Sequence, residues 1–74
     1  MIRTAVVSLS TMNAIAYRQK LSNGDISITI LKYGENQPGI ASISKTSGEP
    51  VPAANTNTKI FTPEAFQEAV ELTR

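Results

Sequence analysis

Cysteine, histidine and tryptophan are all absent from this 74-residue chain. Without cysteine it has no disulfide and no thiolate nucleophile, and without histidine it has no imidazole base or metal ligand. Zinc sites in proteins are normally built from these two residue types, so the composition argues against a structural zinc. We therefore expect no metal and no other cofactor.

An excess of charge and a long apolar run are also lacking. Seven basic residues are balanced by six acidic ones, for a net charge of +1, so composition favours neither nucleic acid nor an anionic membrane as partner. No stretch approaches the roughly 20 apolar residues of a membrane span. The apolar residues near the N-terminus are interrupted by Ser8, Ser10 and Thr11, which argues against a signal peptide. We expect no membrane partner and a cytoplasmic location.

The chain is short enough that its stability is a concern. A domain of this size buries only about 60% of its unfolded surface. With disulfides and zinc disfavoured, oligomerisation is the remaining common way to stabilise so small a domain. The sequence leaves open whether the protein is a monomer or a homodimer.

The apolar pattern predicts a single α+β domain over residues 1–74. It is an antiparallel β-meander of about four or five strands with one C-terminal helix packed on one sheet face. The position of the first strand in the sheet is left open. Residues 46–56 are rich in Ser, Gly, Pro and Asn and predict a loop, with Pro50 and Pro52 excluding a central strand there. The expected strands are 3–9, 14–21, 26–33, 40–45 and a short edge strand at 57–61, and the expected helix is 63–73.

The hairpin between residues 14 and 33 is the clearest local signal. Asn23-Gly24 is typical of a two-residue type I′ turn, which fixes the register of the strands on either side. The predicted register pairs Tyr17 with Ile30 and places both in the core. It places the alternate residues of both strands on the outer face.

The helix is marked at both ends. Thr62 is the expected N-cap, followed by Pro63 at the first helical position, and Phe61 and Phe66 are spaced to form a hydrophobic staple. Arg74 is expected to complement the negative C-terminal end. The expected inward stripe is Phe66, Ala69, Val70 and Thr73 with Ala65 beside it, and Glu64, Gln67, Glu68 and Glu71 are expected to face water.

No catalytic arrangement is recognisable, and we expect that the protein is not an enzyme. The six carboxylates are predicted in turns, loops or the exposed helix face, where acid–base catalysis is not favoured. No histidine is present to activate a serine, and Ser44 and Lys45 are strand neighbours whose side chains point to opposite faces. None of the glycines forms a phosphate-binding motif.

One predicted surface carries basic and aromatic groups together. The outer face of the hairpin 14–33 is the candidate binding surface, because charge follows phosphates and rings stack on bases in proteins that bind single strands. A polar outer face is also the default for an antiparallel sheet. The candidate binding residues are Arg18, Lys20, Thr29, Tyr33 and Lys45.

The order of elements resembles that of a family of transcriptional coactivators. The residues that carry the resemblance are Leu31-Lys32-Tyr33 at the end of the hairpin and Thr62-Pro63-Glu64 at the helix start. The family implies a dimer that binds single-stranded DNA on a β surface. This chain departs from it in a longer loop before the helix and in fewer basic and aromatic strand residues.

Two functions from different classes remain. The first is a small non-enzymatic module that binds another protein, as an adaptor or inhibitor, with self-association as a homodimer left open; edge strands and the loop 46–56 are its candidate contacts. The alternative is a single-stranded nucleic-acid-binding module that uses the outer face of the hairpin 14–33.

Overall fold

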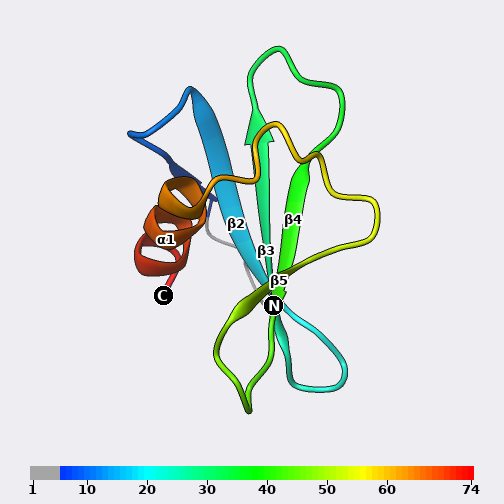
Figure 1. Ribbon diagram of the computed structural model, residues 1–74. Helices are drawn as coiled ribbons and strands as arrows, with labels where there is room; N and C mark the ends of the chain where they lie inside the picture. Colours follow the sequence, from blue (N-terminus) through cyan, green and yellow to red (C-terminus); the bar gives the residue numbers. More distant parts are fainter. Residues whose placement is uncertain (1–5) are drawn as a thin grey trace.

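A computed structural model describes residues 6–74 of the chain and shows one antiparallel sheet with a helix on one side (Figure 1). The five strands lie in the sheet in sequence order, so β1 is the edge strand beside β2. The helix packs mainly on β2 and β3. The predicted α+β meander is thus confirmed. The elements are β1 (Val6–Ser8), β2 (Ala14–Lys20), β3 (Ile26–Lys32), β4 (Gly39–Ile43), β5 (Pro50–Pro52) and α1 (Pro63–Leu72).

The last strand differs from the prediction. Residues 57–61 form no strand, and the fifth strand is Pro50–Pro52, within the predicted loop. Because β5 pairs only with β4 and lies at the edge of the sheet, its prolines remove no ladder hydrogen bond from an interior strand. The predicted start of the first strand, residues 3–5, lies outside the described residues.

The hairpin loop has three residues instead of two. The backbone N–H of Leu21 donates to the Asp25 carbonyl (2.8 Å), and that of Gly24 donates to the Leu21 carbonyl (3.0 Å). Gly24 has φ +93°, whereas Asn23 does not have a positive φ, so the predicted type I′ turn is wrong. A three-residue loop that ends in a left-handed glycine is the next most common hairpin connection.

This extra loop residue shifts the register by one. Ala16 is opposite Ile30 and Arg18 is opposite Ile28, where the prediction placed Tyr17 and Gln19. Because side chains alternate, the shift moves every β2 side chain to the other face. The predicted core face of β2 is therefore wrong, while the core face of β3 is correct. Small alanines, not large side chains, lie beneath the helix.

The core lies between α1 and the face of the sheet that it covers, which we call the helix face. Ala16, Ile28 and Ile30 of the sheet and Ala65 and Ala69 of the helix have no exposed surface. Alanine on both layers lets the helix approach the sheet closely, and Phe66 then fills the remaining volume at 2% exposure. The predicted inward helix stripe is confirmed for Ala65, Phe66 and Ala69, which are the buried residues of α1.

The helix start follows the sequence prediction, and its end does not. Thr62 Oγ1 accepts a hydrogen bond from the Ala65 backbone N–H (3.2 Å), and the rings of Phe61 and Phe66 lie with centroids 4.3 Å apart. The helix ends at Leu72 with Thr73 as C-cap, one residue earlier than predicted, so Arg74 lies beyond the last turn, which contains no basic residue. Arg18 of β2 donates to the Val70 carbonyl at that end.

Candidate interaction surfaces

The structure separates the five residues that the sequence placed on one binding surface. Arg18 and Lys20 lie on the helix face, because they are opposite Ile28 and Ile26. Thr29 and Tyr33 belong to the opposite face, where Thr29 is 4% exposed and Tyr33 is 85% exposed. The predicted shared face is therefore wrong, and the cause is the one-residue register shift.

Lys45 lies far along the sheet from Tyr33. Its side chain lies over Gly24 in the hairpin loop, and its backbone N–H donates to Asp25 Oδ1 (3.4 Å). Tyr33 follows the opposite end of β3. The five residues therefore do not form one surface.

The face of the sheet opposite the helix is the first surface of interest, and we call it the open face. No helix covers it among residues 6–74 (Figure 1). All of its described strand residues are uncharged. By strand alternation and register they are Val6, Ser8, Ile15, Tyr17, Gln19, Ser27, Thr29, Leu31, Ile40, Ser42 and Val51, with Tyr33 just beyond β3.

Large apolar side chains on the open face are exposed to solvent. Ile15 and Leu31 are cross-strand neighbours and are each 40% exposed, and Val6 and Val51 at the two edges are more exposed still. A hollow of about 360 Å³ lies beside Ile15, Leu31 and Tyr33. A typical polar outer face of an antiparallel sheet does not have this composition, and exposed apolar surface is typical of interaction sites. The polar Ser27 and Thr29 at the centre of the face are buried, so the exposed apolar residues lie around them.

The sheet edge at β5 is poorly suited to strand addition. Within Pro50–Pro52 only Val51 has a backbone N–H, since proline has none. Strands at an edge that cannot donate hydrogen bonds resist pairing with another chain. The structure therefore favours the open face over this edge as a contact surface.

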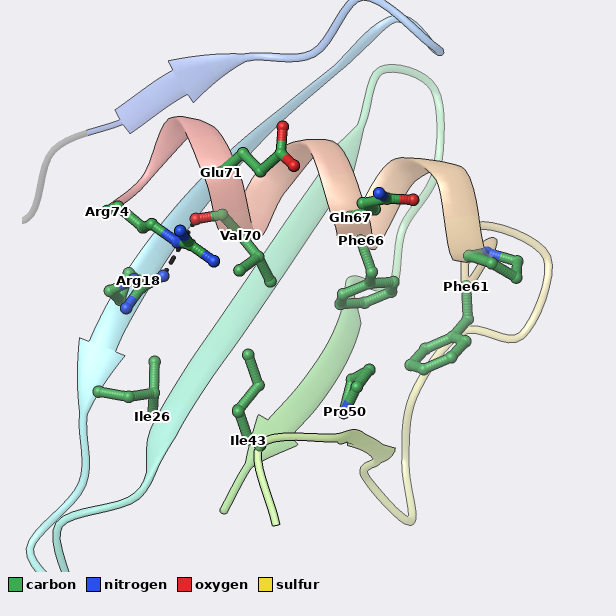
Figure 2. A pocket seen from close by; sticks show the side chains of 12 residues that line it. Arg18, Ile26, Ile43, Pro50, Phe61, Phe66, Gln67, Val70, Glu71 and Arg74 are labelled. Carbon is green, nitrogen blue, oxygen red and sulfur yellow. Dashed lines mark hydrogen bonds between the residues drawn. The ribbon is translucent and has the colours of Figure 1, made fainter. Parts of the chain in front are cut away.

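A groove beside the helix is the second surface of interest. It has a volume of about 590 Å³ and lies between α1 and the strands β3 to β5. Phe66 and Val70 point down from the helix toward Ile43 and Ile26 of the sheet, and Pro50 lies at the side (Figure 2). The groove exists because the helix packs mainly on β2 and β3 and leaves Ile43, at the end of β4, only partly buried, whereas Gly39 and Ala41 of the same strand are buried.

Two guanidinium groups lie at one end of this groove. Arg18 donates from Nη2 to the Val70 carbonyl (3.1 Å) and from Nε to Thr73 Oγ1 (3.4 Å). Arg74 lines the same end (Figure 2). The sequence does not predict this site, because the predicted register places Arg18 on the other face of the sheet. The groove also depends on where the helix packs on the sheet.

A cluster of hydrogen bonds joins the helix to the loop between β1 and β2. The Glu68 carboxylate accepts hydrogen bonds from the backbone N–H and the hydroxyl of both Ser10 and Thr11. These bonds, with the Ser10 hydroxyl as the largest cause and the Ser10 backbone N–H next, lower the pKa of Glu68 to about 2. Glu68 was expected to face water without partners. These hydrogen bonds instead hold the β1–β2 loop against the helix, and they occupy both oxygens of the carboxylate.

No group of three or more His, Cys, Asp or Glu side chains is placed to hold a metal ion within residues 6–74. In the same range, no helix has the length and apolar character needed to cross a membrane.

Comparison with known proteins gives no relative. No protein-family model matches the chain, and neither the curated proteins nor the solved structures include a significant match. The resemblance to single-strand-binding coactivators therefore has no support beyond the order of elements, and function must be argued from the surfaces themselves.

Proposed function

We propose that this protein is a small non-enzymatic interaction module that binds through the open face of its sheet, and that its first partner is a second copy of itself. The observation that carries the proposal is the composition of that face. It exposes Ile15, Leu31, Val6 and Val51, and its described strand residues include no charge.

The absence of charge favours a second copy as the partner. Two copies of a charged face repel each other when they meet, whereas an uncharged face brings no like charges together. Face-to-face packing of two antiparallel sheets, about 10 Å apart, is also a common way to bury apolar strand residues. A dimer of this kind gives the domain a second buried layer on the side that the helix leaves bare.

The size of the face predicts weak association. The five strands contain 25 residues in all, and at about 3.3 Å per residue and about 4.8 Å between strands they span on the order of 400 Å². A standard interface buries roughly 800 Å² per partner. We therefore expect a dimer that dissociates on dilution, with any tighter complex requiring a different protein.

The test measures molar mass by sedimentation at several concentrations for the wild type and two matched variants. Leu31→Lys places a charge on the open face, and Leu72→Lys places the same charge on an exposed position of the helix (49% exposed). We expect the wild type and Leu72→Lys to dimerise as concentration rises, and Leu31→Lys to stay monomeric. A wild type that stays monomeric throughout, or equal dimerisation of both variants, contradicts self-association through this face.

Nucleic-acid binding is not favoured by this geometry. A single-strand platform needs basic and aromatic side chains on one face, but Arg18 and Lys20 lie on the face opposite Tyr33. Adding a short single-stranded oligonucleotide at low salt to the same sedimentation series tests the alternative. A salt-sensitive mass shift that Lys20→Ala abolishes would support nucleic-acid binding over self-association.

Two other expectations belong to the proposal. A role as adaptor or inhibitor of another protein uses the same open face, and Leu31→Lys is expected to abolish that binding as well. A cytoplasmic location is expected, and fractionation of cells that express a tagged chain would test it.

A further inference from the structure

The groove beside the helix plays no part in the proposed self-association, because it lies on the helix face. Its walls are apolar over most of its length: Phe66 and Val70 from the helix oppose Ile26 and Ile43 from the sheet (Figure 2). Ile26, Ile43 and Val70 are only partly buried, so apolar surface remains exposed to solvent inside the groove. Its volume of about 590 Å³ is in the range of small-molecule sites.

The charged side chains that line the groove lie at its end near the helix C-terminus. Arg18 uses two of its five N–H donors on Val70 and Thr73, which fixes the guanidinium beside the groove. The remaining donors have no hydrogen-bond partner among residues 6–74. Arg74 brings a second guanidinium to the same end, and Glu71, the carboxylate that also lines the groove, points from the helix away from Ile26 and Ile43 (Figure 2).

Arg18 and Arg74 bring two cations to this end of the groove and Glu71 brings one carboxylate, so the side chains that line it carry a net charge of +1, which favours an anion. A guanidinium binds a carboxylate with two parallel charge-assisted hydrogen bonds, which are stronger than neutral ones. At the other end the groove reaches Phe61 and Pro63 at the helix start. It therefore runs along the ten-residue helix, about 15 Å, with charge at one end and apolar walls along the rest.

We propose that the groove binds a fatty-acid-type ligand, with its carboxylate between Arg18 and Arg74 and its hydrocarbon chain along Phe66, Val70, Ile43 and Ile26. The chain buries exposed apolar surface on both walls. The carboxylate occupies donors of Arg18 that its contacts with the helix do not use. A neutral lipid leaves the guanidiniums unpaired, and a cationic one is repelled by them.

The experiment titrates sodium decanoate, below its micelle concentration, into the full 74-residue chain and records amide NMR shifts and binding heat. We expect shifts at Ile26, Ile43 and Val70 with none at Leu31 on the open face. Decanol and decyltrimethylammonium are the headgroup controls, and both are expected to bind at least about tenfold more weakly, because a hydrogen bond to a charged group contributes about 1.5 kcal/mol or more.

Three variants separate binding from folding. Arg74→Gln removes one cation from an exposed residue and is expected to weaken decanoate binding about tenfold while leaving decanol binding unchanged. Arg18→Lys keeps the charge but loses the planar fork, and is expected to weaken decanoate binding as well. The control Lys59→Gln removes a cation outside the groove and is expected to change nothing.

Several results overturn the proposal. These are no binding of decanoate, equal binding of all three amphiphiles, shifts centred on Leu31 instead of the groove, or decanoate affinity that Arg74→Gln leaves unchanged. Two of these results, no binding of decanoate and unchanged affinity of Arg74→Gln, do not depend on whether the protein dimerises. Dimerisation is measured separately, by molar mass and by the Leu31→Lys variant.

Discussion

Replacing Phe66 with alanine tests how the helix is attached to the sheet. Phe66 is 2% exposed, packs in the core between α1 and the strands, and contacts Phe61 through its ring. Removing a fully buried phenylalanine side chain costs about 3–5 kcal/mol, because the transfer free energy is lost and a cavity remains. We expect Phe66→Ala to lower the free energy of unfolding by this amount.

This loss is large for a domain of this size. At about 0.05–0.15 kcal/mol per residue, a 74-residue chain has a total stability of roughly 4–11 kcal/mol. A domain of 60–100 residues loses about 4–8 °C in Tm per kcal/mol. We therefore expect Phe66→Ala to melt at least about 12 °C below the wild type, and to be partly unfolded at room temperature if the wild type is at the low end of that range.

The assay is urea unfolding followed by far-ultraviolet circular dichroism, since the chain has no tryptophan for fluorescence. All proteins are measured at one concentration, because dimerisation stabilises the folded state by mass action. Leu72→Ala is the matched control: Leu72 is on the same helix and 49% exposed, and we expect a loss below about 1 kcal/mol. Equal losses for the two variants, or a loss below 1 kcal/mol for Phe66→Ala, would refute the docking of α1 on this face.

Three further outcomes are expected, each measured by the same unfolding assay. Thr62→Ala should cost about 1 kcal/mol through loss of the N-cap hydrogen bond, and Thr58→Ala in the exposed turn before it should cost little. Gly24→Ala should cost about 1 kcal/mol or more because its φ is +93°, whereas Asn23→Ala should cost less, the reverse of what a type I′ turn would require of Asn23. Glu68→Gln should destabilise at neutral pH; the folded pKa of about 2 lies below the ordinary 4.5, so the stability from Glu68 is present above pH 4.5 and is lost as the pH falls toward 2, where wild type and variant should converge. A difference that persists unchanged near pH 2 would mean that the charge of Glu68 is not what holds the β1–β2 loop.

Local patterns determined the first four strands, the helix and where the helix begins, but not the fifth strand. Strict alternation with β-branched residues made β3 predictable, and its core face with Ile28 and Ile30 was correct. Thr62, Pro63 and the Phe61–Phe66 staple marked the helix start, because capping depends on residues a few positions apart. The adjacency of β2, β3 and β4 followed from short connections between neighbouring strands. The position of β1, which the sequence left open, is given by the structure as the edge beside β2.

Only the tertiary structure decided which face of β2 is buried. Its two faces carry either large apolar residues, such as Ile15 and Tyr17, or small ones, such as Ala14 and Ala16, and alternation alone cannot choose between them. The choice depends on close approach of α1, which small side chains permit, and on a loop one residue longer than Asn-Gly suggests. Because of this one extra loop residue, Arg18 lies on the helix face near the C-terminus of α1, and Ile15 is exposed on the open face. The groove arises from contacts between residues more than 40 positions apart in sequence, such as Arg18 with Val70, which no local pattern encodes. The open face is formed by strand pairs fewer than 20 positions apart, but the helix face had to be known before this face could be identified as the uncovered one.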